Sequence, residues 1–407
     1  MNLKPDILIV GAGVAGITCA LKCQEEGLSF LIVEKSERVG GRLGSINEEG
    51  YVFDIGFQVF NTSYHKTKTF LDLNQLDLRV FKPGAAIYIG NKFKIISDPI
   101  RDLNKIFNTL FSGIPTLADK VRILKLKYSL SNYSLECDTS KDVHTFIFLK
   151  EYGFSEQIIS NFFKPFFAGV FLEKKLQTSS KFFKYVFSKF NQGLASIPSK
   201  GMQEIPENML RSIDQKNLLL GSELMFLPRE KKIKLKNGLT IIPNQIILTG
   251  NSQKLITKED LHYNQVKTLY FSSKECPNYS EYIHIFPEEI FINNIAFLTS
   301  ISPKYSENND NLLSVSVLED TKASESELIH HVTDRLENIY GGNFNFLKYF
   351  NIRQATINHP VNYFDKKIKT LADEGIYLSG DNLIHGSIEG AVISSIQVME
   401  ELKGKFT

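Results

Sequence analysis

The sequence contains no tryptophan and only four cysteines, and its charges almost cancel. Four cysteines in 407 residues form no disulfide framework, and no Cys-x-x-Cys pair or Cys/His cluster indicates a metal site. We therefore expect a reducing compartment and no bound metal. Lys and Arg number 47 against 45 Asp and Glu, for a net charge of +2. A balance this close to neutral argues against a nucleic-acid-binding protein.

Long hydrophobic runs are also missing. The uncharged stretch from Ile7 to Leu21 is shorter than the roughly 20 apolar residues of a membrane-spanning helix. Asp6, just before it, is acidic where a signal peptide would be basic. The stretch 161–172 is interrupted by Lys164 and Pro165. We expect a cytoplasmic protein, with peripheral contact to a membrane as an open alternative.

Several familiar catalytic motifs are absent. The chain has no Gly-x-Ser-x-Gly, His-Glu-x-x-His or Walker lysine motif, which argues against a serine hydrolase, a zinc protease and a P-loop nucleotidase. No Gly-x-Gly-x-x-Gly follows a later strand, so a reductase with two dinucleotide sites is not expected. The sequence identifies no catalytic residue.

What the chain does have is a dinucleotide-binding fingerprint at its start. An apolar strand (6–10), a glycine turn (11–16), a helix to about residue 26 and a second strand (30–33) lead to Glu34. Gly11 permits the tight turn, Gly13 lets a pyrophosphate approach the backbone, and Gly16 lets the helix pack on the strand. The phosphates would lie at the helix N-terminus, and Glu34 would accept hydrogen bonds from the ribose. The candidate cofactor-binding residues here are Gly11, Gly13, Val14, Ala15, Gly16, Glu34 and Lys35.

A paired glycine follows the acid, in the segment Arg38-Val39-Gly40-Gly41-Arg42. Gly40 and Gly41 let the backbone pass close to a ligand. The planar guanidinium of Arg42 could clamp a phosphate, and an ion pair on the surface is the alternative. Together with the opening fingerprint, this segment resembles the FAD-binding flavoprotein superfamily of amine oxidases, protoporphyrinogen oxidases and phytoene desaturases. The resemblance implies FAD as the cofactor.

The C-terminal segment resembles the same superfamily. A short strand (375–379) leads into Gly380 and Asp381, and a helix with apolar residues at helical spacing starts near Ser387. The resemblance implies that Gly380 and Asp381 bind the ribityl–pyrophosphate part of FAD. It also implies that the amides around Ser387 and Ile388 face the flavin N1/O2 edge, where the positive helix end stabilises negative charge.

Two segments between these ends are further candidates for binding the cofactor. The resemblance places a flavin-contact loop at 54–60, with Gly56, Phe57 and Gln58 as candidate flavin neighbours. For the two side chains, a plain strand end is an equally good interpretation. The resemblance also places a strand that holds the adenine around Leu224.

The alternation of strands and helices predicts an α/β fold. The resemblance implies a discontinuous Rossmann-like FAD-binding domain and a second, α+β substrate domain with a mixed sheet and a helical layer. The expected FAD-binding domain comprises residues 1–80, 196–260 and 360–407, and the expected substrate domain comprises residues 81–195 and 261–359. A single helix is predicted over Tyr64–Leu73.

Aromatic and basic residues accumulate between Lys141 and Phe190, where 12 Phe and 8 Lys face 4 Asp and Glu. A helical layer with an aromatic core and a solvated basic face explains this composition. The alternative is an apolar substrate channel whose mouth rests on an anionic membrane. That alternative depends on phenylalanines beside lysines, namely Phe162, Phe163, Phe166, Phe167, Phe182 and Phe183 with Lys164, Lys181 and Lys184.

Together these features predict an FAD-dependent oxidoreductase that removes hydride from a carbon of an apolar, isoprenoid- or polyene-like small molecule. Desaturase and oxidase chemistry both fit, and the electron acceptor is unidentified. Flavin amine oxidases of the superfamily carry an aromatic residue where this chain has Ser387, which disfavours an amine. A non-redox FAD isomerase or mutase and a catalytically inactive flavin-binding protein remain alternatives.

Four more side chains are candidates to lie near the edge of the flavin ring. His359 and His385 are predicted to be solvated loop histidines. Lys267 and Lys304 could approach the flavin through water, and the sequence places neither of them.

Overall fold

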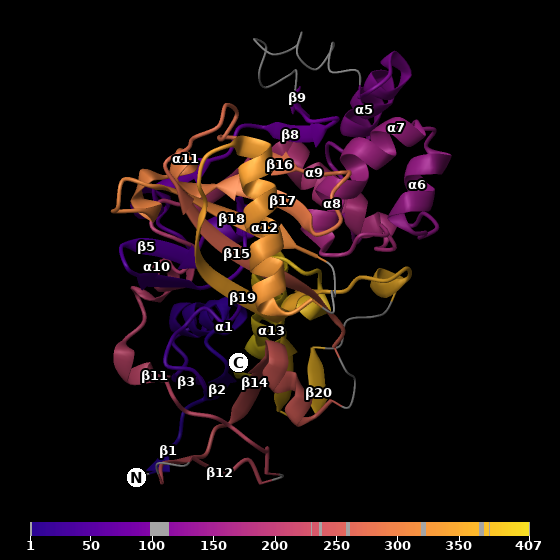
Figure 1. Ribbon diagram of the computed structural model, residues 1–407. Helices are drawn as coiled ribbons and strands as arrows, with labels where there is room; N and C mark the ends of the chain where they lie inside the picture. The colour runs from indigo at the N-terminus through magenta and orange to yellow at the C-terminus, as the bar shows by residue number, and fades with distance from the viewer. Residues whose placement is uncertain are drawn as a thin grey trace.

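The computed structural model describes residues 2–97, 114–228, 230–235, 238–257, 261–318, 323–365, 370–373 and 375–406. Figure 1 shows two sheets, an upper and a lower one in this view, with helices α1 and α13 between the two sheets. A helical layer lies beside the upper sheet. The mixed α/β fold with a Rossmann-like sheet, a second mixed sheet and a helical layer confirms the predicted fold class.

The lower sheet has six strands and is parallel except at one edge. Its order is β11 (Leu218–Leu219), β3 (Phe30–Val33), β2 (Ile7–Val10), β14 (Gln245–Thr249), β21 (Ile376–Ser379) and β20 (Leu371–Asp373). All residues of β2, β3 and β21 are buried, as expected for parallel strands covered on both faces. The first and last segments of the chain therefore meet in one sheet, on either side of β14.

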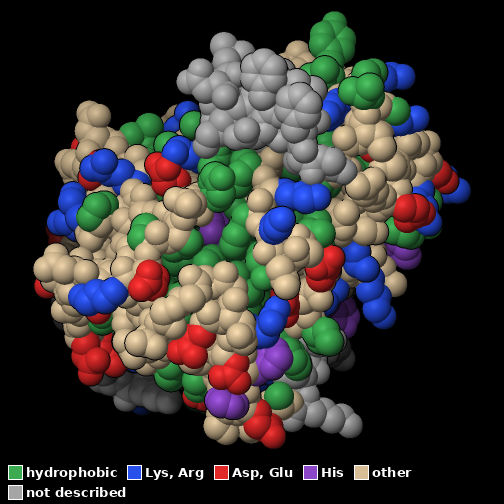
Figure 2. Space-filling view, turned by 45° about the horizontal axis from the view of Figure 1, so that its top comes forward, with side chains coloured by type: hydrophobic (Ala, Val, Ile, Leu, Met, Phe, Trp, Pro, Cys, Tyr) green, Lys and Arg blue, Asp and Glu red, His purple; other side chains and the backbone are tan. Residues whose placement is uncertain are grey.

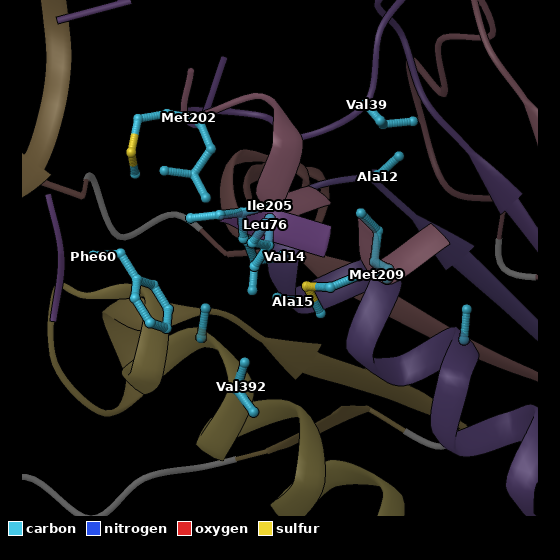
Figure 3. Close-up of a cluster of buried hydrophobic side chains, with 14 of the residues drawn as sticks. Ala12, Val14, Ala15, Val39, Phe60, Leu76, Met202, Ile205, Met209 and Val392 are labelled. Carbon is cyan, nitrogen blue, oxygen red and sulfur yellow. The ribbon is translucent and has the colours of Figure 1, made fainter. Parts of the chain in front are cut away.

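Helices α1 (Val14–Glu25) and α13 (Ile388–Phe406) pack against each other beside this sheet. Figure 3 shows the core that they share with α10 (Glu204–Leu210), where Ala15, Met209 and Val392 approach one another. Ser395 of α13 also donates a hydrogen bond to the carbonyl of Ala15 across this interface (2.9 Å). The two chain ends are thus held together by an apolar core as well as by the sheet.

The upper sheet has seven strands and is mainly antiparallel. Its order is β19 (Asn345–Ile357), β15 (Tyr263–Ser273), β18 (Asn311–Val317), β17 (Ile292–Phe297), β16 (Ile283–Ile285), β8 (Gly84–Ile89) and β9 (Lys92–Ser97), with β16 and β8 parallel. Helix α12 (Glu325–Tyr340) buries Leu328, Val332 and Leu336, which recur at helical spacing, in the apolar cluster of this sheet. It begins at a capping box formed by Ser324 and Glu327.

Smaller elements lie outside the two large sheets. They are the strands β1 (Asn2–Leu3), β4 (Ser45–Glu48), β5 (Tyr51–Asp54), β6 (Phe60–Asn61), β7 (Leu78–Val80), β10 (Ala195–Pro198), β12 (Ile233–Lys234) and β13 (Thr240–Ile241), and the helices α2 (His65–Lys68), α3 (Leu73–Leu76) and α11 (Leu298–Ile301). Among the described residues there are also 3₁₀ turns at Gln215–Asn217, Gly250–Leu255, Pro303–Tyr305, Tyr363–Asp365 and Asp381–Leu383. The single helix predicted over Tyr64–Leu73 is wrong, because the chain forms two short helices there, and Asp72 caps the second.

The helical layer comprises α5 (Leu117–Ser129), α6 (Thr145–Glu151), α7 (Glu156–Ile158), a π-turn (Ile159–Phe163), α8 (Lys164–Phe171) and α9 (Ser180–Gln192). Its core is aromatic, as the composition predicts, with Phe163, Phe167 and Phe183 buried in contact with one another. The predicted basic face is wrong at Lys181 and Lys184. Both are buried, and they pair with Asp365 and Asp138 at 2.9 and 2.7 Å.

Candidate functional site

A cavity of about 1060 Å³ lies where the two sheets and the helical layer meet. Of the eighteen residues predicted to bind a cofactor, seventeen line it and Gly16 does not. The seventeen are Gly11, Gly13, Val14, Ala15, Glu34, Lys35, Gly40, Gly41, Arg42, Gly56, Phe57, Gln58, Leu224, Gly380, Asp381, Ser387 and Ile388. The structure thus brings the predicted segments together, and their contact with a cofactor remains a prediction.

Two glycines shape the turn between β2 and α1. Gly11 has φ of +106°, and a side chain there would overlap the hydroxyl of Thr249 on β14. A side chain at Gly16 would overlap the carbonyl oxygen of Gly11, so Gly16 serves helix packing instead of lining the cavity. Gly13 is the N-cap of α1 and has no side chain to cap it, which leaves the first amides of the helix directed at the cavity.

Glu34, at the end of β3, holds this turn in place. Its buried carboxylate accepts hydrogen bonds from the amide of Ala12 (2.7 Å) and from the amide and hydroxyl of Ser36 (2.9 and 2.8 Å). A carboxylate can accept about four hydrogen bonds. The group is therefore positioned by the loop and retains capacity for a hydroxyl donor inside the cavity.

The double-glycine segment lies against the first turn. Gly40 donates to the carbonyl of Ala12 (2.8 Å), and a side chain at Gly40 would overlap the carbonyl oxygen of Leu43. The guanidinium of Arg38 donates to the carbonyls of Gly41 (2.7 Å) and Leu43 (2.8 Å). Arg38 therefore holds the loop shape, a role that the sequence analysis did not assign to it.

Arg42 and Asp381, which lie 339 positions apart, form an ion pair in the cavity wall. Burial alone would lower the pKa of Arg42, but the adjacent carboxylate of Asp381 outweighs it and the pKa is raised. The guanidinium also lies 5.7 Å from the ring centre of Tyr263. The ion pair considered for Arg42 is thus present, but it joins the N-terminal and C-terminal motifs inside the site.

The segment from Gly56 to Gln58 forms another part of the wall. Gly56 has φ of +85°, and a Cβ there would lie 2.6 Å from the side chain of Ile352. Gln58 donates from its amide nitrogen to the carbonyls of Arg42 (2.9 Å) and Ile55 (3.2 Å). Its amide oxygen is buried and has no hydrogen-bond partner. An unsatisfied buried acceptor of this kind is costly unless a ligand donates to it.

His385 lies in the turn before α13, and His359, just after β19, packs against that turn. The prediction that both histidines are solvated is wrong. His359 and His385 are buried, at 2% exposure each. His359 accepts from the amide of Gly386 (2.9 Å) and stacks on Phe182, while His385 lies 3.0 Å from the Ser387 hydroxyl. Burial, reinforced by neighbouring positive charge, lowers the pKa of each histidine to about 3, so both are neutral near pH 7.

The remaining wall of the cavity comes from the helical layer and the upper sheet. Apolar side chains dominate it: Phe166, Val170, Leu172, Phe182, Val186, Phe190, Val266, Ile283, Ile285 and Ile352. Phe182, Val186 and Phe190 recur every four residues and so share one face of α9. Figure 2 shows hydrophobic side chains gathered in a depression near the middle of the molecule.

Polar side chains that the sequence analysis missed interrupt this apolar wall. They are Asn61, Tyr64, Tyr185, Lys189, Asn293 and Asn294. The hydroxyl of Tyr185 and the amide nitrogen of Asn294 are buried without a hydrogen-bond partner. The four-residue spacing of Tyr185 and Lys189 beside the apolar face of α9 is a signal that could have placed them in the wall. Lys267 and Lys304 do not line the cavity, and Lys304 lies 3.2 Å from Asp77.

Leu224 lines the cavity, but the strand predicted around it is not formed. The chain has no regular secondary structure there, and the nearest strand, β11, ends at Leu219. Ser222 donates to the carbonyl of Glu34 (2.7 Å), which holds this segment beside the end of β3. The segment therefore lies next to the predicted ribose-binding acid.

The residues present fit an extended dinucleotide. Glycine backbones, a helix N-terminus and a carboxylate lie at one part of the cavity, and an unsatisfied amide oxygen and a second helix N-terminus lie at another. A mostly parallel sheet with this constellation is typical of a dinucleotide-binding flavoprotein.

The sequence profile of the flavin containing amine oxidoreductases matches residues 14–402, and the chain belongs to this family. Its cofactor is accordingly FAD. The chain is 31% identical over 119 residues to the 4,4'-diapophytoene desaturase (4,4'-diaponeurosporene-forming) of Staphylococcus haemolyticus (strain JCSC1435), which covers 27% of this chain and 22% of the relative. It is 30% identical over 120 residues to the "Probable flavin-containing monoamine oxidase A" of Dictyostelium discoideum, covering 28% of this chain and 26% of the relative.

The fold is shared much more widely than the sequence. A putrescine oxidase solved with bound putrescine superposes with a TM-score of 0.72 at 16% identity, over 99% of this chain and 100% of that one. By sequence, in contrast, the chain matches only 14 to 26% of the length of the first three curated relatives. The helices of the described residues include none with the length and apolarity to cross a membrane.

Proposed function

We propose that this FAD-dependent oxidoreductase removes hydride from a carbon of a largely apolar small molecule, by desaturase or oxidase chemistry. The observation that carries the proposal is a single cavity that runs from the glycine turn at Gly11 to the aromatic face of α9. Flavin supplies the hydride acceptor. The apolar wall would hold the reacting carbon against it and exclude water.

The seventeen lining residues would bind FAD in an extended form. The adenosine would lie between Glu34 and Leu224, the pyrophosphate at Gly13 and the start of α1, and the ring system between Gly56 and the start of α13. Asp381 and Arg42 would lie along the ribityl chain. We also propose the two-domain division, because β8 and β9 pair within the upper sheet whereas β11, β14 and β21 pair within the lower one.

An amine oxidase is the second candidate. Tyr64 and Tyr185 both lie close to Ser387, so aromatic rings are present near the position where this chain lacks the family's aromatic residue. The ammonium of Lys189 argues against this candidate because it lies 5.5 Å from the ring centre of Tyr185. A protonated amine substrate would meet a like charge there.

Anaerobic reduction of the bound flavin tests the proposal. Purified protein should absorb near 370 and 450 nm, roughly as oxidised flavin does, and a polyene or another apolar substrate should bleach the 450 nm band. Bleaching by amines alone would establish the second candidate. Bleaching by neither class would contradict the proposal.

We further propose that helix α5 rests on an anionic membrane surface. Leu117, Val121, Leu124 and Tyr128 are 75, 66, 49 and 86% exposed, and their spacing places them on one face of the helix. Basic residues accompany them, namely Lys120, Arg122, Lys125 and Lys127. Figure 2 shows hydrophobic side chains projecting over the helical layer at the upper right.

Flotation with vesicles of phosphatidylcholine and phosphatidylserine tests this contact. The wild-type protein should float at low salt, and substitution of the four apolar residues by serine should abolish flotation. Ile290→Ser is the control, because Ile290 is also 65% exposed but lies away from α5. Equal flotation of the wild type and the fourfold variant would exclude the proposed surface.

A further inference from the structure

The polar residues in the apolar wall of the cavity lie where a substrate would be held, and two of them face it from one helix. Tyr185 and Lys189 are one turn apart on α9, and both line the cavity. The Lys189 ammonium lies 5.5 Å from the ring centre of Tyr185. One face of α9 therefore presents a hydroxyl and a cation to the same part of the chamber.

The hydroxyl of Tyr185 is a hydrogen-bond donor that the protein leaves poorly satisfied. The residue is 7% exposed, and among the described residues its oxygen makes no hydrogen bond of regular geometry, although the side chain of Ser387 lies near enough to influence its pKa. Burial is the main reason that the pKa of Tyr185 is raised well above 10, so the group keeps its proton near pH 7. A buried donor of this kind is costly to leave unsatisfied, and its position in the cavity wall lets a bound molecule satisfy it.

Lys189 is a cation without a direct counterion. Among the residues that the structure describes, it forms no ion pair, and its ammonium makes a 3.4 Å hydrogen bond to Gln192. Burial lowers the pKa of Lys189, and the charge of Glu389 opposes that effect. Both carboxylate oxygens of Glu389 are turned to α2, where they accept from the amides of Lys66 (3.0 Å) and Thr67 (2.8 Å). Glu389 therefore moderates the field at Lys189 without occupying its donors.

We propose that Tyr185 and Lys189 form an oxyanion subsite that takes a carboxylate at one end of an otherwise apolar substrate. The proposal rests on the proposed function, since it defines the polar end of the same substrate. The two oxygens of a carboxylate match a hydroxyl donor and an ammonium donor on one helix face. Phe182, Val186 and Phe190 on the same face would hold the apolar body.

Binding of model compounds to the FAD-loaded protein tests the subsite, with the flavin absorbance difference spectrum and calorimetry as readouts. The probes are dodecanoate, dodecanol and dodecylammonium, which share a chain and differ in the head group. Dodecanoate should bind roughly 10- to 100-fold more tightly than dodecanol, as a charged hydrogen bond allows. Dodecylammonium should bind most weakly.

Variants assign the preference to the two residues. Lys189→Met and Tyr185→Phe should each weaken dodecanoate binding and leave dodecanol binding unchanged, while Lys189→Arg should keep the preference. Lys164→Met is the matched control, because Lys164 is an exposed lysine of the same layer that does not line the cavity. Equal binding of dodecanoate and dodecanol by the wild type, or a preference that survives Lys189→Met, would overturn the subsite.

The same measurements separate this proposal from the proposed function. If dodecanoate binding depends on Lys189 but no apolar compound bleaches the flavin, the subsite stands and hydride removal fails. If apolar compounds that carry a carboxylate bleach the flavin at rates and half-saturation concentrations that Lys189→Met does not alter, hydride removal stands and the subsite fails.

Discussion

The two parts of the cavity are built from different chemistry. The part proposed to bind the nucleotide (the nucleotide part) consists of backbone, with Gly11, Gly13 and Gly40 leaving space and Glu34 connecting one loop to the next. The part proposed to hold the substrate (the substrate part) consists of side chains from α8, α9 and β16, most of them apolar. Close approach of backbone requires particular residues at fixed spacing, whereas an apolar wall accepts many residues of similar size.

This difference decides how each part responds to mutation. At Gly16 and Gly40, an added methyl group meets backbone carbonyls that cannot move aside. A methylene removed from the substrate part leaves a wall that still excludes water but fits its ligand less well. We therefore expect substitutions in the first part to change folding and flavin content, and substitutions in the second to change substrate affinity alone.

The largest effect is expected at Gly16. An added methyl group would overlap the carbonyl of Gly11 and lie 3.3 Å from the side chain of Ile9, so α1 must shift from the sheet. Overpacking of this kind costs about 1–3 kcal/mol or more. Gly16→Ala should lower the urea midpoint and the flavin content together. Gly27→Ala is the control for backbone strain without overlap, because Gly27, unlike Gly16, has positive φ (+71°) and nothing lies within 4 Å of an added Cβ.

Gly13→Ala separates cofactor binding from folding. Gly13 has φ of −76° and ψ of 179°, which any residue adopts, and a Cβ there would lie 3.9 Å from its nearest neighbour, Gly41. The urea midpoint should match that of the wild type. The methyl group would stand where the pyrophosphate approaches, so flavin content should fall by an order of magnitude or more. Unchanged flavin content would show that the phosphates lie elsewhere.

Buried ionisable groups outside the cavity lining should respond to acid in opposite directions. The pKa of His359 and His385 is lowered to about 3, chiefly by burial, so the unfolded chain binds more protons than the folded one below pH 6.5. Each histidine therefore lowers the stability of the fold as the pH falls from 6.5 towards 3. Asp54, buried at the end of β5, has a pKa raised to about 6 by burial. It acts in the opposite direction, adding stability as the pH falls from 6 to 4.

Urea unfolding at pH 7 and pH 5 measures this balance. The wild type should lose stability at pH 5, and His359→Gln should lose less. Asp54→Asn should lose more, because the opposing contribution of Asp54 is removed. A wild-type midpoint that rises on going to pH 5 would contradict the buried, neutral state of the two histidines.

The sequence predicts which segments come together in the proposed nucleotide part, and it does so for a physical reason. Gly11, Gly16 and Glu34 act through local geometry at fixed spacing, so their pattern can be recognised without knowing what lies opposite. The sequence could place Gly380 and Asp381 at the cavity because the C-terminal segment has the same strand–turn–helix pattern as the N-terminal one. The role of Arg38 in holding the loop was missed because it donates to backbone carbonyls, and a backbone acceptor does not depend on residue type.

The substrate part could not be predicted to the same degree. Tyr185 and Lys189 become site residues only because α9 packs against the C-terminal turn, a contact between segments about 200 positions apart. From the sequence, His359 and His385 are predicted to be solvated loop residues. In the fold, His359 packs against Phe182 and His385 packs against Tyr185, and these contacts help to bury them. Lys181 and Lys184 likewise turn inward because Asp365 and Asp138 lie within reach. Each of these outcomes depends on tertiary contacts that no local spacing encodes.

The smallest effect is expected from Phe190→Leu, which tests whether the apolar face of α9 contacts the substrate. Phe190 lines the cavity and contacts Phe166 ring to ring at 5.5 Å, whereas Phe187, three residues earlier, packs against Phe183 in the core of the helical layer at 5.8 Å. Phe190→Leu should raise the substrate KM by roughly 10-fold or less and leave flavin content unchanged. Phe187→Leu should lower the urea midpoint slightly and leave KM unchanged. Equal changes of KM in the two variants would mean that the apolar face of α9 does not contact the substrate.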